Sequence, residues 1–244
     1  MSNLSSPLSV GRKQASANTR LELMRILIVN PNTSHEATHA INAEALRAAS
    51  ATTEVIARTA PRGPLNIGSD FEIASQVPVV LEMLENGGWD AAIIAAYGDP
   101  GLELARKYMK APVVGIGEAS MKEADRIGSR IAIVSSNPNH EQLYRERAAK
   151  SGIAEKIIAI RYLRKGDRSV LAAISDRAWL VSAATEASRT AIEVDNADVI
   201  VIAGGPLAGI ARAIRQNLNF AILDPVACAV GRIERWVRTG TPDL

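Results

Sequence analysis

Two histidines are the side chains of this sequence best suited to moving protons near neutral pH. His35 follows the tripeptide Asn30-Pro31-Asn32 by a few residues, and His140 directly follows Asn137-Pro138-Asn139. Each tripeptide comes after an apolar run, so the two histidines occupy similar places in two similar halves of the chain. Facing each other across one cleft, they would form an acid–base pair. This pair is one hypothesis for the catalytic groups.

His35 and His39 also complete the pattern H-E-x-x-H, in which two histidines on one helix face bind zinc. Here the match falls in the first turns of a helix that follows a strand, and the third histidine of the chain is His140. We therefore interpret the segment as a helix surface with one histidine facing the cleft. The sequence predicts neither a metal site nor a cofactor.

Short polar side chains follow the apolar runs that open the two halves, namely Asn30, Asn32 and Thr33 in one half and Ser135 and Ser136 in the other. Backbone N–H groups at the start of a helix bind anions, and these side chains add further donors. The same residue types are common in turns and at helix N-caps, and both interpretations can hold at once. We predict that these residues hold an anionic group of a ligand.

Tyr97 and Glu118 are further candidates for groups that act on a ligand. A phenol with a pKa near 10 is better suited to hydrogen bonding with an oxyanion than to removing a proton. Glu118 opens a predicted helix, where the helix dipole favours a carboxylate, and a helix start at a cleft is also a place for a base. Asp99, followed by Pro100 and Gly101, is interpreted as the N-cap of the next helix.

A glycine-rich stretch at 204–209 lacks the Lys and Ser/Thr of a phosphate-binding loop and the G-x-G-x-x-G spacing of a dinucleotide site. It implies no nucleotide. Gly204, Gly205 and Pro206 follow an apolar run just as Ala96 and Tyr97 do in the first half. We therefore predict that both loops line one substrate site.

The elements that must position these residues alternate between short apolar strands and helices, which predicts parallel sheets with right-handed crossovers. The expected fold class is α/β, with two pseudo-symmetric Rossmann- or flavodoxin-like lobes and a ligand cleft beyond the carboxyl ends of the strands. Strands are expected at 24–29, 54–58, 91–95, 113–116, 130–134, 157–160, 199–202 and 221–223, and helices at about 34–49, 71–84, 102–109, 118–127, 141–151, 177–194, 207–215 and 225–238.

Three segments are expected in the domain organisation. Residues 24–116 together with 220–240 form lobe 1, and residues 117–219 form lobe 2. The Ser-rich residues 1–23 form a disordered extension.

The composition excludes several classes of function. The net charge of +2 gives no basis for nucleic-acid binding, and no apolar run reaches the roughly 18 residues of a membrane span. The single cysteine, Cys228, cannot form an internal disulfide, which favours a cytoplasmic protein. Cys228 lies in an apolar part of the last helix and is expected to be an inert core residue.

At its loops the sequence resembles the hydantoin racemase branch of the aspartate/glutamate/hydantoin racemase superfamily. The resemblance implies two α/β lobes with the active site between them, a homo-oligomer, and a small-molecule substrate such as a carboxylate, hydantoin or related ring. Equivalents of Asn30, Asn32, Ser135 and Ser136 would hold that substrate. The similar stretches are IVNPNTS at 28–34, IIAAYGDPGL at 93–102, VGIGEA at 114–119, VIVIAGGPLAG at 199–209 and LDPV at 223–226.

The chain departs from the family at the positions that carry the chemistry. The family pattern places one cysteine at the position of Ala96 and a second at that of Gly204. In the family, one thiolate removes the α-proton and the other thiol returns a proton on the opposite face, which alanine and glycine cannot do. Related sequences also tend to have S-I-E-[GS] at 66–69, where this chain has Gly68 in place of the glutamate. Ser69, which ends this stretch, is a predicted substrate contact.

Three hypotheses for the function remain open at this point. The first is a racemase-like isomerase that transfers a proton at a carbon α to a carbonyl without the two-cysteine mechanism. The second is a lyase, decarboxylase or ring hydrolase on the same scaffold, since arylmalonate decarboxylases resemble it and have glycine at the first cysteine position. The third is a non-catalytic protein that binds a small molecule.

Overall fold

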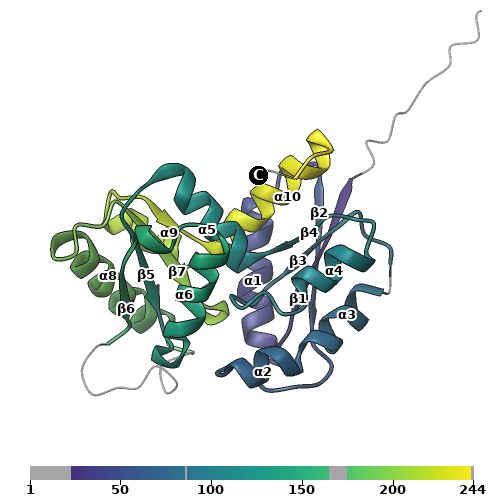
Figure 1. Cartoon of the computed structure of the whole chain (residues 1–244), viewed down its shortest axis with the longest axis horizontal. Helices are drawn as coiled ribbons and strands as arrows, with labels where there is room; N and C mark the ends of the chain where they lie inside the picture. The colour runs from purple at the N-terminus through teal and green to yellow at the C-terminus, as the bar shows by residue number, and fades with distance from the viewer. Residues whose placement is uncertain (1–22, 86, 165–174, 243–244) are drawn as a thin grey trace, which may run out of the picture.

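Two four-stranded parallel sheets form the framework of the molecule (Figure 1). The computed structural model describes residues 23–85, 87–164 and 175–242. The strand order is β2-β1-β3-β4 in the first sheet and β6-β5-β7-β8 in the second. In both sheets, therefore, the second strand along the chain lies at one edge, followed by the first, third and fourth. The strands are β1 (Met24–Asn30), β2 (Thr53–Thr59), β3 (Ala91–Ile94), β4 (Val113–Gly115), β5 (Ile131–Ser135), β6 (Ile157–Tyr162), β7 (Val199–Ala203) and β8 (Ile222–Leu223).

Helices cover both faces of each sheet, which confirms the predicted α/β class. They are α1 (His35–Ala48), α2 (Asp70–Ser75), α3 (Val77–Glu85), α4 (Leu102–Tyr108), α5 (Ile116–Ile127), α6 (Glu141–Lys150), α8 (Arg177–Glu193), α9 (Ile210–Asn217) and α10 (Pro225–Thr239). Short 3-10 turns lie at Pro138–His140, Ala154–Lys156 and Gly205–Leu207.

The apolar runs of the strands supply two cores to each sheet, because successive side chains of a strand point to opposite faces. In β1, Ile26 and Ile28 pack in the core beneath α1 and α10, whereas Leu27 and Val29 pack in the core beneath α3 and α4. The second sheet is covered by α8 and α9 on one face and by α5 and α6 on the other. Strands buried on both faces therefore read as continuous apolar runs.

The C-terminal segment differs from the lobe division expected from the sequence, which grouped 220–240 with lobe 1. Ile222 and Leu223 form β8 and pair with β7 of the second sheet. Only the following helix, α10, packs against the first sheet, through Val226, Ala229 and Ile233. The two sheets lie side by side, with α1 and α10 between them in the view of Figure 1. The extension expected at 1–23 lies outside the described residues except for Leu23.

The predicted helix at 71–84 is interrupted at Gln76 and forms two helices, α2 and α3. Pro78 explains the interruption, because proline has no N–H to donate to the carbonyl four residues earlier and its ring collides with that carbonyl. The 3-10 turn with Pro206 likewise delays the start of α9 to Ile210. Among the described residues, no helix is long and apolar enough to cross a membrane.

Candidate active site

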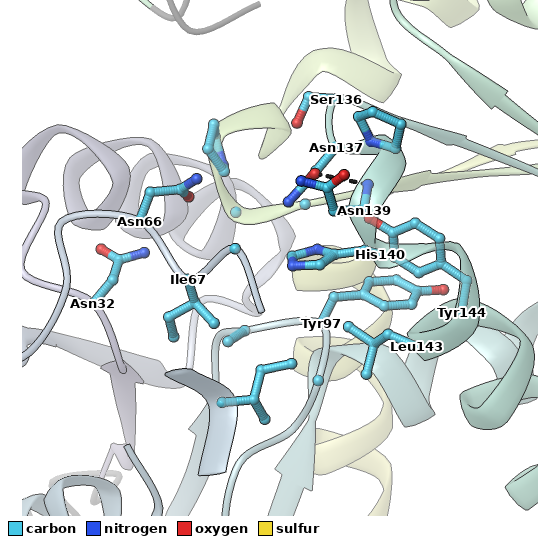
Figure 2. A pocket seen from close by; sticks show the side chains of 18 of the residues that line it. Asn32, Asn66, Ile67, Tyr97, Ser136, Asn137, Asn139, His140, Leu143 and Tyr144 are labelled. Atoms are coloured by element: carbon cyan, nitrogen blue, oxygen red, sulfur yellow. Dashed lines mark hydrogen bonds between the residues drawn. The ribbon is translucent and has the colours of Figure 1, made fainter. Parts of the chain in front are cut away.

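A cavity of about 590 Å³ lies between the two sheets, at the carboxyl ends of β1, β3, β5 and β7. Parallel sheets bind ligands at this end because the loops that follow the strands converge there. The loops at 66–68, 95–98, 136–140 and 204–206 all reach the cavity (Figure 2). Of the residues proposed from the sequence, those that line it are Asn32, Ala96, Tyr97, Ser136, His140, Gly204, Gly205 and Pro206.

Asn30 and Thr33 lie outside the cavity lining and build the loop that carries Asn32. The side-chain amide of Asn30 donates to Oδ1 of Asn32 at 2.8 Å and to Oγ1 of Thr38 at 3.0 Å. The backbone N–H of Thr33 donates to the carbonyl of Pro64 at 3.0 Å. In this structure both residues therefore support the site rather than line it.

Ser135 and Ser69 are also placed in structural roles. Ser135 is fully buried, and its hydroxyl lies 2.5 Å from the hydroxyl of Tyr144. Ser69 is the N-cap of α2, where its hydroxyl accepts from the backbone N–H of Glu72. Neither side chain lines the cavity, whereas Ser136, the residue after Ser135, does.

The proposed pair of His35 and His140 is not assembled at the cavity. His35 is exposed at the start of α1, with Nδ1 3.3 Å from Oγ1 of Thr59. His39 is exposed on the same helix, and among the described residues no group of three His, Cys, Asp or Glu side chains is arranged to hold a metal. His140 alone of these histidines lines the cavity.

Glu118 is held in an ion pair outside the cavity. Its carboxylate accepts two hydrogen bonds from Arg106, at 3.1 and 2.6 Å, and lies 3.7 Å from Arg232. Burial raises the pKa of Glu118, but the hydrogen bonds and charge of Arg106 outweigh burial, and the pKa is lowered overall. This ionised carboxylate has a structural role, in an ion pair at the start of α5, and Glu118 does not line the cavity.

Tyr97 lines the cavity with its ring but directs its hydroxyl elsewhere. Its ring meets the ring of Tyr144 edge-on, with centroids 5.2 Å apart. Figure 2 shows the hydroxyl on the side away from Asn32 and Asn66. Burial raises the pKa of Tyr97 far above its ordinary value. The predicted role in hydrogen bonding to an oxyanion therefore does not fit this geometry.

His140 points its imidazole into the cavity from the end of the 3-10 turn that precedes α6 (Figure 2). The ring stands edge-on to Tyr144, with centroids 6.0 Å apart, and its buried Nε2 has no hydrogen-bond partner among the described residues. Burial lowers the pKa of His140, against the opposing effects of a Gly68 backbone oxygen and of the carboxylates of Asp70 and Glu72. A lowered pKa leaves the imidazole neutral at neutral pH and able to accept a proton.

Amide side chains dominate the polar lining, and sequence reasoning missed most of them. Asn66, Asn137 and Asn139 line the cavity together with Asn32, whereas no Asp or Glu of the described residues does. In the sequence, Asn137 and Asn139 carry only the signal of turn residues. Tyr144, which is also part of the lining, follows His140 by four residues, the spacing that places two side chains on one helix face. Tyr162 and Arg164, at the end of β6, complete the missed polar lining.

Ala96 after β3 and Gly204 after β7, the two positions at which the resemblance leads us to expect thiols, both lie on the cavity wall. Gly204 has a φ of +128°, a conformation that side chains rarely adopt, although a Cβ there would meet no atom closer than Oγ of Ser136 at 3.7 Å. Cys228 is remote from both, in α10, where it packs against the core of the first sheet. Burial raises the pKa of its thiol well above the ordinary value.

Asp99 ties the loop after β3 to the rest of the site. It was expected to cap the next helix, α4, but Gly101 occupies that N-cap. Instead the buried Asp99 carboxylate accepts from the backbone N–H groups of Gly117 and Glu118, at 2.9 and 2.8 Å, and so caps α5. Arg147 of α6 lies 3.4 Å from Asp99 and donates to the carbonyl of Gly98. This contact fixes the loop against the helix that follows His140.

A cavity lined by amides, one neutral imidazole, tyrosines and the guanidinium of Arg164, placed where two parallel sheets meet, is typical of an α/β protein that binds a small polar molecule. The model of one family, Asp/Glu/hydantoin racemase, matches residues 26–233. The chain therefore belongs to the Asp/Glu/hydantoin racemase family.

Individual relatives point to the hydantoin racemase-like branch. The chain is 30% identical over 220 residues to a hydantoin racemase of Pseudomonas sp. (strain NS671), which covers 89% of this chain and 87% of the relative. An allantoin racemase from Klebsiella pneumoniae superimposes with a TM-score of 0.83 at 32% identity, covering 90% of this chain and 89% of that one. An allantoin racemase from Pseudomonas fluorescens gives 0.82 at 29% identity, covering 90% and 93%.

Proposed function

We propose that this protein is a racemase-like isomerase that transfers a proton at a carbon α to a carbonyl, in a small carboxylate or a cyclic ureide or imide. The named relatives are racemases of hydantoin and allantoin, which supports an isomerase acting on such rings. The observation that carries the proposal is the imidazole of His140, directed into a cavity that has no thiol and no carboxylate among its described residues. His140 would take the place of the family cysteines as the base.

The lining suits a planar ring of alternating N–H and C=O groups. Each amide of Asn32, Asn66, Asn137 and Asn139 offers both a donor and an acceptor. When His140 removes the α-proton, negative charge develops on the neighbouring carbonyl oxygen, and fixed donors around that oxygen stabilise it. No carboxylate lines the cavity among the described residues, and the nearest carboxylates that act on His140, those of Asp70 and Glu72, lie outside the lining.

Proton exchange in D2O tests the proposal directly. Loss of the α-proton signal is followed by NMR for 5-substituted hydantoins, allantoin, aspartate and glutamate, with and without the protein. We expect exchange above the protein-free rate for at least one ring substrate, and we expect His140→Ala to abolish it. Exchange that is equal with and without the protein for every compound would contradict the proposal.

A second candidate function is the decarboxylation of a substituted malonate, which reaches the same enolate by loss of CO2 instead of a proton. The observation that favours it is the uncharged wall formed by Ala96, Ile67 and Ile73, against which a neutral CO2 would leave. CO2 release from aryl- and alkylmalonates separates this activity from isomerisation, and its absence across such a series would exclude the candidate.

A further inference from the structure

We propose that this site transfers protons on only one face of its substrate, the face turned toward the second sheet, and that His140 both removes and returns the proton. At a single stereocentre the site would then only exchange the proton, with retention of configuration. Its net isomerisation would be the transfer of a proton between two atoms on one face of a conjugated ring, rather than inversion of a single centre. This inference rests on the proposed function and specifies its stereochemical course.

The ionisable groups of the cavity come almost entirely from one side. His140, Tyr144, Tyr162 and Arg164 all belong to the second lobe, in the segment from the end of β5 to two residues beyond β6. Tyr97 is the exception, and its hydroxyl is buried away from the cavity. The first-sheet wall otherwise presents amides, aliphatic groups and glycines: Asn32, Asn66, Ile67, Gly68, Ile73 and Ala96.

Inversion at carbon needs a proton to leave one face and another to arrive on the opposite face, and so needs an acid or base on each side. Ala96 occupies the place on the first-sheet wall where the family pattern has a thiol, and its methyl group exchanges no proton. The amides of Asn32 and Asn66 do not ionise near neutral pH and can only hold a substrate. Within the described part of 23–116, no side chain of the cavity wall is therefore placed to protonate the far face.

The turn that carries His140 and the tyrosine behind it set the direction of its ring, which extends toward the backbone of Gly68 in the first lobe. The side chain of Asn137 accepts from the backbone N–H of Asn139 at 3.0 Å, which fixes the turn that carries the histidine. Tyr144 stands edge-on behind the ring, and the hydroxyl of Tyr144 is held by Ser135 at 2.5 Å. Packing on the second-sheet side thus leaves the imidazole one direction, toward the cavity.

The proposed step balances without any further reactant. The lone pair of an imidazole nitrogen forms an N–H bond as the C–H bond of the α-carbon breaks. The C–H electron pair moves into the bond between the α-carbon and the carbonyl carbon, and the carbonyl π pair moves onto oxygen. The imidazolium then returns a proton to the same face, either to the same carbon or to a conjugated atom of the ring, and the enolate electrons move back.

The test compares exchange with inversion for each pure enantiomer of 5-isopropylhydantoin in D2O. C5–H loss is measured by NMR, and enantiomeric purity by chiral chromatography. We expect one enantiomer to exchange at least 10-fold faster than it loses purity, and the other to exchange at the protein-free rate. Exchange of both enantiomers with an equal loss of purity would overturn the one-face inference and leave the proposed function intact. Absence of protein-dependent exchange for both this hydantoin and the wider panel would overturn both proposals.

A matched pair of variants tests the role of the first-sheet wall. Ala96→Cys places a thiol on the first-sheet wall of the cavity, and we expect it to raise inversion of the exchanging enantiomer at least 10-fold. Ala96→Ser adds a group of similar shape that does not ionise near neutral pH, and it should gain no inversion. A folded Ala96→Cys protein, judged by thermal unfolding, that inverts no faster than the wild type would contradict the inference. Equal gains in the two variants would also contradict it.

Discussion

His140 is the residue on which the proposed chemistry depends most. General-base catalysis by a positioned side chain typically contributes a factor of about 10² to 10⁴. We therefore expect His140→Gln to lower kcat for proton exchange by about 10²-fold or more, with a smaller change in ligand affinity, because the amides that line the cavity remain. His35→Gln, outside the cavity, is the matched control and should leave kcat unchanged. A larger loss from His35→Gln than from His140→Gln would reverse the assignment.

The pH dependence of exchange provides a second measurement on the same residue. Burial lowers the pKa of His140 below its ordinary value of 6.5. Since the neutral imidazole is the base, kcat/KM should rise with pH through this lowered pKa and then stay level. The midpoint should lie below 6.5. A midpoint above 6.5 would contradict the lowered pKa, and a midpoint that is the same in the residual activity of His140→Gln would show that another group acts as the base.

Gly204 differs from Ala96 in its backbone conformation, so we expect a cysteine at the two positions to cost different amounts of folding stability. Holding a residue other than glycine in a sparsely populated backbone conformation costs about 1–3 kcal/mol. At a φ of +128°, Gly204→Cys and Gly204→Ala should therefore both destabilise the protein by about that amount. Ala96→Cys should cost less, and urea unfolding measures the difference. Gly204→Ala as stable as the wild type would show that the backbone relaxes freely at this position.

Sequence patterns located the loops that line the cavity but not always the side chains that face it, because successive side chains point in different directions. Ser135 ends β5 and points into the core at Tyr144, while Ser136 lines the cavity. The two histidines also lie at different distances along the chain from their Asn-Pro-Asn tripeptides. His140 directly follows its Asn-Pro-Asn, whereas two residues separate His35 from the other, and this carries His35 to an exposed position on α1. Spacing alone could not settle either outcome.

At the scale of elements, Gln76 joins the two loops that supply the amides of the first-sheet wall. It is only 3% exposed and sits at the interruption between α2 and α3. In the amide orientation that gives both its nitrogen and its oxygen hydrogen-bond partners, the nitrogen donates to the carbonyls of Pro31 at 2.9 Å and Arg62 at 3.2 Å. The oxygen accepts from the hydroxyl of Ser75. The loops before Asn32 and Asn66 therefore share one buried support.

Replacing Gln76 should disturb both stability and binding. Leaving the carbonyl of the buried Pro31 without a donor costs about 1–3 kcal/mol. We expect Gln76→Ala to lower the free energy of unfolding by about that amount and to weaken ligand binding. Gln76→Glu keeps the shape but directs an acceptor at two carbonyls, so it should be at least as destabilising near neutral pH. Urea unfolding and calorimetric titration measure the two effects. Wild-type stability in Gln76→Glu would exclude this support.

Most elements were predictable because short β-branched runs and the helices between them carry local signals. The interruption at Gln76 escaped prediction because the apolar pattern continues through it and only Pro78 marks it. The two-residue strand β8 was recognised, but its sheet was not. Membership of a sheet depends on where the chain crosses from one lobe to the other, and a local pattern does not encode that crossing.

At the scale of the whole molecule, the cavity depends on how the two sheets are joined. Helix α5 packs against both, with Ile116 and Ala119 in a core of the first sheet and Met121 and Ala124 in a core of the second. On the cavity side, Arg147 links α6 to the loop after β3. Repeated βα units predicted two lobes from the sequence, but the side chains that join them are far apart along the chain and gave no pattern.

Asp224 lies at this joint, between β8 of the second sheet and α10 on the first. It is 1% exposed, and its carboxylate accepts from the backbone N–H groups of Gly209 at 2.6 Å and Val226 at 2.9 Å. Burial raises the pKa of Asp224 from 3.8 to about 6, and the charge of Glu44 adds to the effect. The folded protein therefore holds this proton more tightly than the unfolded chain does.

Linkage gives the sign of the resulting pH dependence. Because the folded pKa lies above the unfolded one, the contribution of Asp224 to stability is complete below about pH 4 and is lost as the pH rises to about 6. The Tm of the wild type minus that of Asp224→Asn should therefore fall between pH 4 and 6.5 and then stay level.

Asp198 is the control. Backbone hydrogen bonds from Ser129 and Arg130 outweigh the effect of burial and lower the pKa of Asp198. The same difference for Asp198→Asn should instead fall as the medium becomes more acidic, through the range below 3.8. A difference for Asp224→Asn that rises with pH would mean that the ionised carboxylate, rather than the protonated one, stabilises the joint between the sheets.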